Sequence, residues 1–263
     1  MNRIEEKMAQ LKEAGKKAFI TYTTAGLPDL DTTKRIIRTQ EAAGIDVIEL
    51  GIPFSDPVAD GPVIQDASYK AILNGTTLKK VFELMKDIRN DGCNVPIIFM
   101  MYYNTIYHYG IKDFVKKCIE CGVDGLIVPD LPFEEQKELQ TAINEDENAP
   151  ILIQLVAPVS KQRIPMLLEN ARGFVYCVSQ MGVTGKGANF HKDIRKYLEE
   201  VKSVSKVPVM MGFGIRTVQD VKPLKDVIDG AIVGSHFIKL LESSNFSDET
   251  ITTYIKTFKQ ELN

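Results

Sequence analysis

The sequence predicts an α/β protein built as a single (β/α)8 TIM barrel, and three observations lead to this fold class. Eight short apolar runs alternate with helical patterns along the 263 residues. Most of these runs are continuously apolar, as expected for strands of a parallel sheet that is covered on both faces. A weak internal repeat is also present: Gly-Ile-Asp at 44–46, Gly-Val-Asp at 122–124 and Val-Ile-Asp at 227–229 each lie just before such a run. A doubly wound open sheet is the alternative, but it usually has fewer strands at this length.

An extra N-terminal helix precedes the repeated units. Ile4, Met8 and Leu11 share one apolar face, and Gly15 ends the pattern. The strands are predicted at Ala18–Thr23, Val47–Leu50, Pro96–Met101, Gly125–Pro129, Ile151–Val156, Phe174–Val178, Val207–Met211 and Gly230–Val233. No linker rich in proline, glycine or serine divides the chain, so residues 1–263 are expected to form one domain.

Helical patterns occupy the intervals between strands. The clearest has apolar residues at the spacing of one helix face, namely Leu78, Val81, Phe82, Met85 and Ile88. Pro132 is expected to open a helix that runs through Ile143, because proline favours the first helical position. Ser160 is expected to cap Ile164–Ala171, and Ser247 to cap the last helix. A further pattern runs from Ile194 to Val204, and a short helix is expected directly after the eighth strand, beginning near Ser235.

Composition excludes several classes of function. The net charge is −3, which gives no reason to expect nucleic acid or an anionic membrane as a partner. No stretch approaches the ~20 apolar residues that span a bilayer. The chain shows neither an export signal nor a disulfide framework, which favours the cytoplasm.

Metal binding is not expected from the cysteines or histidines. Cys118 and Cys121 have C-x-x-C spacing, but they lie in a helical pattern with no second pair, so packing in the core is the better interpretation. His108, His191 and His236 show no metal-ligand spacing and are interpreted as surface or cap residues.

Glu49 is the strongest candidate for a catalytic residue. Alternation along Val47–Leu50 places Val47 and Glu49 on one covered face, where an unpaired carboxylate is unfavourable. No lysine or arginine occurs between Gly44 and Tyr69 to pair with it locally. Glu49 is therefore expected to be a catalytic residue, although an ion pair with a distant cation is the structural alternative.

Polar residues and glycines cluster where the predicted strands end, which is where barrel active sites form. Asp56 and Asp60 follow the second strand and Asp130 the fourth. Asp56 is interpreted as a turn residue or a partner contact, and Asp130 as a helix cap in preference to a site residue. No lysine stands at a strand end to form a Schiff base, and no serine elbow is paired with a histidine.

Glycines after the last three strands predict a phosphate site. They are Gly182, Gly185 and Gly187, then Gly212 and Gly214, then Gly234 before Ser235. Backbone N–H groups without a neighbouring Cβ approach an anion closely, and a helix that starts at Ser235 would add its N-terminal amides. Two carboxylates, Glu49 and Asp60, facing such a site suit proton transfer on a phosphorylated small molecule.

These residues resemble the tryptophan synthase α subunit family over essentially the whole chain. The resemblance rests on the run from Glu49 to Pro62, on Met101–Asn104, on Gly182–Gly185, on Gly212–Ile215 and on Gly234-Ser235. It implies cleavage of indole-3-glycerol phosphate to indole and glyceraldehyde 3-phosphate, a retro-aldol carbon–carbon scission. Glu49 would supply the acid and later the base, and Asp60 would stabilise positive charge at the indole N–H.

The resemblance also assigns binding roles and a partner. Tyr22, Tyr102 and Tyr176 would line the indole pocket or lie near the reacting carbon, and Phe213 would contact substrate. Gly185, Gly214, Gly234 and Ser235 would cradle the phosphate. Loop Gly182–Gly187 would form a lid, with Thr184 reaching Asp60. A β subunit would carry pyridoxal phosphate and make tryptophan from indole in an α2β2 assembly, so no cofactor or metal is expected in this chain. The partner would face Asp56, Pro57 and the segment around Asn104.

Two other functions stay open on the sequence. One is a barrel isomerase or synthase that acts on another phosphorylated metabolite, which would leave the Glu49–Asp60 segment without a matched role. The other is a binding subunit that mainly activates a β partner, against which the intact carboxylates and glycine cradle argue.

Overall fold

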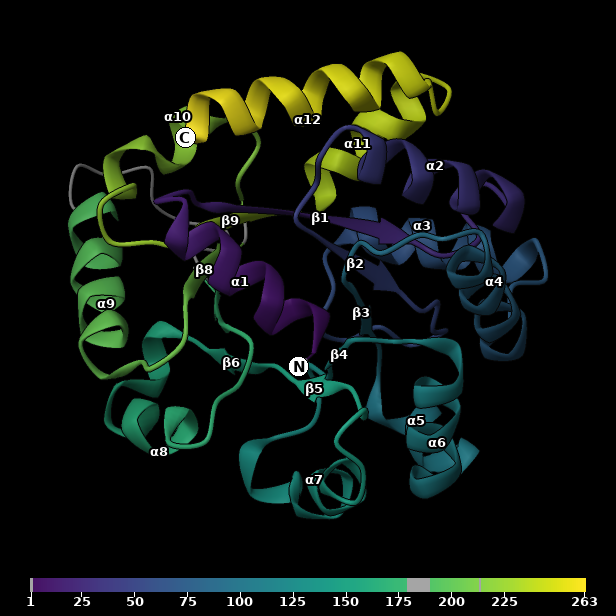
Figure 1. The fold of residues 1–263 in the computed structure, drawn as a ribbon, viewed down its shortest axis with the longest axis horizontal. Coiled ribbons are helices and arrows are strands. Elements are labelled where there is room, and N and C mark those ends of the chain that lie inside the picture. Colours follow the sequence, from purple (N-terminus) through teal and green to yellow (C-terminus); the bar gives the residue numbers. More distant parts are fainter. Residues whose placement is uncertain (1, 179–189, 213) are drawn as a thin grey trace.

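The computed structural model describes residues 2–178, 190–212 and 214–263. Its sheet has nine parallel strands in the order β5-β4-β3-β2-β1-β9-β8-β7-β6. Figure 1 shows the strands at the centre and the helices around them, as in a barrel. No helix in this described part of the chain combines the length and apolar character needed to span a membrane.

The strands confirm seven of the predicted runs nearly as expected and divide the remaining one. Their bounds are β1 Ala18–Thr24, β2 Val47–Gly51, β3 Ile97–Met100, β4 Gly125–Ile127, β5 Ile151–Leu152, β6 Gln154–Val156, β7 Val175–Val178, β8 Val209–Gly212 and β9 Gly230–Val233. The predicted fifth strand, Ile151–Val156, appears as β5 and β6 because its first part pairs with β4 and its second with β7. At the break, the Ile153 N–H donates to Leu126 C=O at 2.9 Å. The two ends of the sheet therefore meet within one continuous run, which closes the barrel.

The helices follow the predicted order, with two local corrections. Their bounds are α1 Arg3–Glu13, α2 Leu30–Ala42, α3 Pro62–Leu73, α4 Leu78–Asn90, α5 Tyr103–Tyr109, α6 Ile111–Cys121, α7 Lys137–Asn144, α8 Ile164–Leu168, α9 Phe190–Val204, α10 Val218–Val221, α11 Ser235–Ser243 and α12 Asp248–Leu262. The predicted helix from Pro132 begins as a 3-10 turn, Phe133–Glu135, before α7. Ser160 lies inside another 3-10 segment, Pro158–Arg163, and does not cap α8. Ser247 caps α12 as predicted, accepting from the Thr250 N–H.

Two hydrophobic layers position the strands. The first lies inside the ring and includes Ile20, Val47, Ile98 and Met210, with Ile4 and Met8 of α1 packed against it. The second lies between the sheet and the outer helices. Figure 1 shows α1 lying across the ring of strands. The extra helix thus covers the end of the barrel from which the strands start, and the other end is left for the loops that follow the strands.

The internal repeat in the sequence corresponds to a repeated contact at the start of the strands. Asp46, Asp124 and Asp229 each accept the backbone N–H of a residue at the start of the neighbouring strand. These donors are Phe19 at 2.8 Å, Ile97 at 2.8 Å and Val209 at 2.7 Å. Each carboxylate also pairs with a cation from an outer helix, namely Lys259, Arg89 and Lys202 in that order. The repeated aspartate therefore fixes strand register and has no part in the site at the other end.

Candidate active site

A cavity of about 530 Å³ opens at the ends of the strands opposite α1. Residues from β1, β2, β3, β7 and the loops after β2, β8 and β9 line it. They are Tyr22, Glu49, Ala59, Asp60, Gly61, Ile64, Met100, Tyr176, Gly214, Ile215, Arg216, Gly234, Ser235, His236 and Lys239. The structure therefore brings Glu49 and Asp60 together with the predicted phosphate residues Gly214, Gly234 and Ser235.

Glu49 is a buried carboxyl group without a cationic partner among the described residues. It points to the inner face of β2, like Val47, and is 1% exposed. Its Oε1 has no hydrogen-bond partner among residues 2–178, 190–212 and 214–263. Burial raises the pKa of Glu49 to about 8, because the charged form loses its hydration. In the described structure, the predicted alternative of an ion pair with a distant cation is not found. Glu49 therefore keeps its proton near neutral pH and can act as an acid.

Asp60 is held by Tyr102 at the side of the cavity. The Tyr102 hydroxyl donates to Asp60 Oδ2 at 2.9 Å and accepts from the Ala59 N–H at 3.0 Å. The Tyr102 ring stacks on Phe54 with ring centroids 5.0 Å apart. The pKa of Asp60 is raised, because the effect of burial exceeds that of the Tyr102 hydrogen bond, which lowers it. The loop after β2 is thus tied to the segment after β3, and the orientation of the Asp60 carboxylate is set.

Two tyrosines form the inner wall because the neighbouring strands end in glycine. A Cβ at Gly51 would lie 1.9 Å from the Tyr22 hydroxyl oxygen, and one at Gly212 would lie 2.4 Å from Tyr176 Cε1. Both rings are buried, and the pKa of each phenol is raised by burial first and by the nearby carboxylates. Both therefore stay protonated and present an aromatic surface beside Glu49.

The end of the cavity near β8 and β9 has the features of an anion site. Gly214 has φ +73°, and apart from its chain neighbours no described residue has a heavy atom within 4 Å of a Cβ built on it. Gly234 is the N-cap of α11, which begins at Ser235 as predicted. The first amides of α11 consequently face the cavity, and its dipole favours an anion there.

Three cationic or ionisable side chains at this end were not predicted. Arg216 follows the Gly214 loop, and His236 and Lys239 lie in the first turns of α11. His236 had been interpreted as a surface or cap residue, but it lines the cavity. Burial, and then Arg216, lower its pKa, which favours the neutral imidazole. Lys239 lies four residues after Ser235, so the two residues share one face of the helix. This spacing is the one signal in the sequence that could have placed Lys239 beside the site.

The other predicted residues have the following positions. Asp130 does cap a helix, but the helix is α5, through a 2.9 Å bond from the Tyr103 N–H. Asp56 is exposed and accepts from its neighbour Ser55 at 2.6 Å, as a turn residue does.

Cys118 and Cys121 are buried free thiols, as predicted. Thr184, Gly185, Phe213 and the rest of loop Gly182–Gly187 lie outside the described residues.

A family model described as tryptophan synthase alpha chain matches residues 8–263. The chain belongs to the tryptophan synthase alpha chain family. It is 71% identical to the tryptophan synthase alpha chain of Lachnospira eligens over 263 residues, which cover 100% of both chains. It is 43% identical to that of a Thermoanaerobacter species, covering 100% of this chain and 98% of the relative.

Solved structures of tryptophan synthase share the fold. A crystal structure of the alpha subunit from Legionella pneumophila is 30% identical, with a TM-score of 0.90, and covers 100% of this chain and 98% of that one. A tryptophan synthase structure from M. tuberculosis, 27% identical, gives a TM-score of 0.87 and covers 100% of both chains. The predicted family and barrel are confirmed. As a tryptophan synthase alpha chain, the protein is a carbon–carbon lyase of tryptophan biosynthesis that acts on indole-3-glycerol phosphate, and its family implies a β-subunit partner.

Proposed function

We propose that Glu49 and Asp60 carry out the cleavage in the cavity described above. The observation on which this depends is a buried Glu49 carboxyl, with no hydrogen-bond partner for Oε1 among the described residues, in the same cavity as Asp60 and the start of α11. The aromatic wall of Tyr22 and Tyr176 suits the indole ring, and the region of Gly214, Gly234 and Ser235 suits the phosphate. The substrate would lie between them, with its scissile bond near Glu49.

Glu49 first donates its proton to C3 of the indole ring. The ring then becomes an electron acceptor, and the bond between C3 and the glycerol carbon can break with its electron pair returning to the ring. The resulting Glu49 carboxylate takes the proton of the hydroxyl on the carbon that becomes the aldehyde. The carboxyl group is thereby restored in each turnover, and its raised pKa keeps both protonation states accessible near neutral pH.

Asp60 stabilises the positive charge that develops on the protonated ring. A fixed carboxylate beside the ring N–H strengthens its hydrogen bond as charge develops, which lowers the barrier more than it strengthens ground-state binding. Tyr102 keeps one carboxylate oxygen occupied at 2.9 Å, so the other is available for the ring. This division of roles needs one protonated acid and one ionised acid, which agrees with the different surroundings of the two groups.

Arg216 and Lys239 are proposed to attract the substrate's phosphate. Replacing either by glutamine should weaken binding of glycerol 3-phosphate by about three- to tenfold, because each exposed cation contributes only modestly to an ion pair. Isothermal titration calorimetry would measure the change. Lys222→Gln is the matched control, since that exposed lysine lies close by in the chain but does not line the cavity. Unchanged affinity in an Arg216→Gln/Lys239→Gln double variant would contradict this assignment.

The β subunit is proposed to bind over the loop after β2, carry pyridoxal phosphate and convert the released indole to tryptophan in an α2β2 assembly. A shallow groove beside the mouth is lined by Asp56, Pro57, Pro62 and Tyr69. Val58 is 84% exposed and Tyr69 is 62% exposed, which is unusual for apolar side chains so close together. The chain is also proposed to be a single-domain cytoplasmic protein that binds neither nucleic acid nor membranes.

Indole release tests the proposed function directly. The purified chain should release indole slowly from indole-3-glycerol phosphate, and faster when a tryptophan synthase β subunit is added, because docking would order the loops at the mouth. Indole is followed by chromatography in both conditions. Absence of release in both would rule out the lyase assignment. Release with no effect of the β subunit would contradict only the proposed docking surface.

A further inference from the structure

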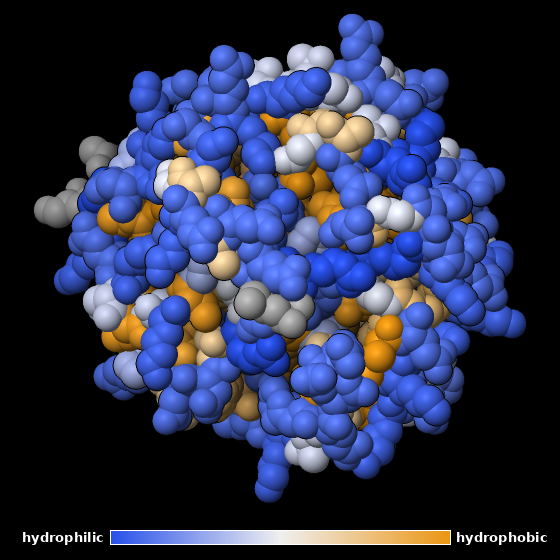
Figure 2. All heavy atoms as spheres, viewed as in Figure 1, coloured by the Kyte–Doolittle hydropathy of each residue, from blue (hydrophilic) through white to orange (hydrophobic). Residues whose placement is uncertain are grey.

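A second cavity, also of about 530 Å³, lies at the opposite end of the barrel from Glu49. It is formed where the chain enters β1, β8 and β9, beneath the C-terminal half of α1. The lining residues are Met8, Leu11, Lys12, Gly15, Lys16, Lys17, Lys202, Ser205, Lys206, Val207, Pro208, Met210 and Asp229. The face of the molecule that carries α1 is mostly hydrophilic (Figure 2), so the apolar surface of this cavity is a local feature.

The charges around the cavity are strongly one-sided. Five lysines line it and Asp229 is the one acid among the lining residues. Asp229 is already neutralised, because its Oδ2 accepts both the Val209 N–H and the Lys202 ammonium. Lys12, Lys16 and Lys206 have no ion-pair partner within the described ranges. The charges of Lys12, Lys16 and Lys206 are therefore not paired with a carboxylate of the described residues.

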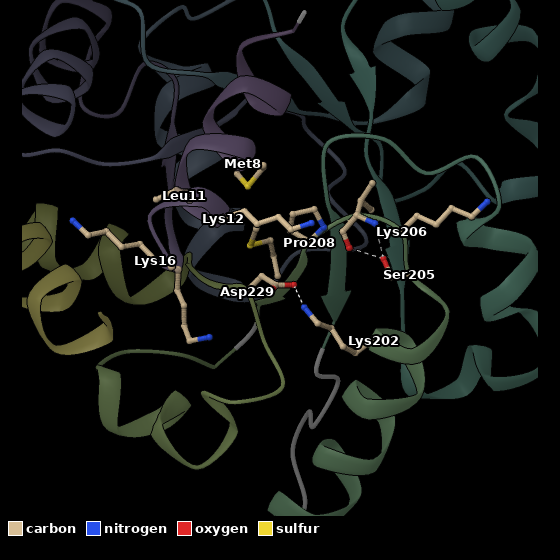
Figure 3. Close-up of a pocket in the computed structure, with 13 residues that line it drawn as sticks. Met8, Leu11, Lys12, Lys16, Lys202, Ser205, Lys206, Pro208 and Asp229 are labelled. Atoms are coloured by element: carbon tan, nitrogen blue, oxygen red, sulfur yellow. Dashed lines mark hydrogen bonds and ion pairs between the residues drawn. The ribbon is translucent and has the colours of Figure 1, made fainter.

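The ammonium group of Lys17 is partly buried. It donates to the Ile228 carbonyl at 2.8 Å. Burial is the largest influence on the Lys17 pKa and lowers it, as do the ammonium groups of Lys202 and Lys225, against the raising effect of Asp229 and Asp226. An anion beside these groups would offset both effects. Figure 3 shows Lys12 reaching over the opening near Pro208, with Lys202 turned to Asp229 and with Lys16 and Lys206 on opposite sides.

The floor of the cavity is apolar. Met8 and Met210 are buried, and Leu11, Val207 and Pro208 are partly exposed. Methionine side chains adapt their shape to a neighbouring ring or chain. A cavity with an apolar floor and an ammonium rim is complementary to a molecule that has an apolar body and one anionic end. A fully hydrated inorganic anion would leave the floor unused.

We propose that this cavity binds a small organic anion, with its apolar part on Met8, Leu11 and Met210 and its anionic group among Lys12, Lys17 and Lys206. The site is separate from the lyase cavity and needs none of its residues. Its ligand class is an aromatic or branched-chain carboxylate, sulfonate or phosphate of modest size.

Binding of 1-naphthalenesulfonate to the full chain tests this site without using lyase activity. In ¹H–¹⁵N NMR titrations, we expect saturable shifts at the amides of Gly15, Lys17 and Ser205, with a dissociation constant of about 1 mM or lower. The uncharged analogue 1-naphthalenemethanol should bind about tenfold more weakly, since the ammonium groups gain nothing from it. Higher salt should weaken binding of the sulfonate only.

A Lys12→Gln/Lys206→Gln variant should lower the sulfonate affinity by about tenfold. The matched control is Lys79→Gln/Lys116→Gln, which removes two exposed lysines from α4 and α6 and should leave affinity unchanged. Both pairs are surface substitutions, so thermal unfolding should confirm that each variant folds. The proposal is overturned if the shifts appear only around Gly61 and Gly234, if both double variants bind alike, or if the neutral analogue binds as well as the anion.

Discussion

Glu49→Gln should lower the rate of indole release by about 10²–10⁴-fold, the range that a positioned acid–base group contributes. Glutamine has almost the same shape as glutamic acid, but it neither donates a proton to C3 nor accepts one afterwards. The phosphate end of the cavity is untouched, so glycerol 3-phosphate should bind with nearly unchanged affinity. Single-turnover measurements of indole formation, together with calorimetry of ligand binding, check the two parts separately.

The same substitution should make the protein more stable at alkaline pH. The folded-state pKa of Glu49, about 8, lies above its ordinary value of 4.5. Between these two values the unfolded chain ionises this group while the folded chain must keep it neutral, so folding becomes less favourable as pH rises. Removing the titration should therefore increase the free energy of unfolding by about 4 kcal/mol at pH 8, given about 1.4 kcal/mol for each pKa unit. The gain should disappear as the pH falls below 4.5, where the unfolded wild type also becomes protonated.

Urea unfolding of both proteins across this pH range measures the gain. Glu83→Gln, which changes an exposed carboxylate on α4, is the control and should show no such pH-dependent difference. A glutamine variant that is less stable than the wild type at pH 8 would mean that Glu49 has a structural partner after all. A variant that still releases indole at more than a tenth of the wild-type rate would remove Glu49 as the acid.

The barrel could be predicted because its signals are local and repeated. A continuous apolar run such as Phe174–Val178 is expected when both faces of a parallel strand are covered. The aspartates at 46, 124 and 229 recur because the same strand-start contact is made three times. The division of the fifth strand was not predictable, because no turn residue interrupts Ile151–Val156 and the change of partner at Ile153 depends on closure of the whole ring.

The two carboxylates could be predicted from the sequence, whereas the cations at the other end of the cavity could not. Glu49 stands out because a charge on a covered strand face is rare without a purpose. Arg216 and Lys239 look like any exposed cation, and only the fold places them at one end of the cavity. The close approach of Tyr22 to Gly51 is likewise a contact between neighbouring strands, which a single sequence does not display. Spacing along the chain predicts which strand end a residue occupies, but not which side chains meet across the mouth.

Asp60→Asn should reduce indole release by about 10²–10³-fold, comparable with the loss of one preorganised group that stabilises transition-state charge. Asparagine retains an oxygen that can accept from Tyr102, so the loop after β2 should keep its position. What it loses is the negative charge beside the indole N–H. The expected signature is a lower maximal rate with little change in affinity for glycerol 3-phosphate, measured by steady-state kinetics and calorimetry. Turnover within about threefold of the wild type would show that ring charge is stabilised elsewhere.

Tyr102→Phe separates the Asp60 charge from its hydrogen bond. The ring can still stack on Phe54, but the hydroxyl that donates to Asp60 Oδ2 is gone. Since this bond lowers the pKa of Asp60, its loss should raise that pKa. Asp60 works as the ionised form, so the acidic limb of the pH–rate profile should move to higher pH, while the rate above it falls by only about tenfold. An unmoved acidic limb would mean that Tyr102 only supports the loop that carries Asp60, because a purely steric role has no effect on the ionisation of Asp60.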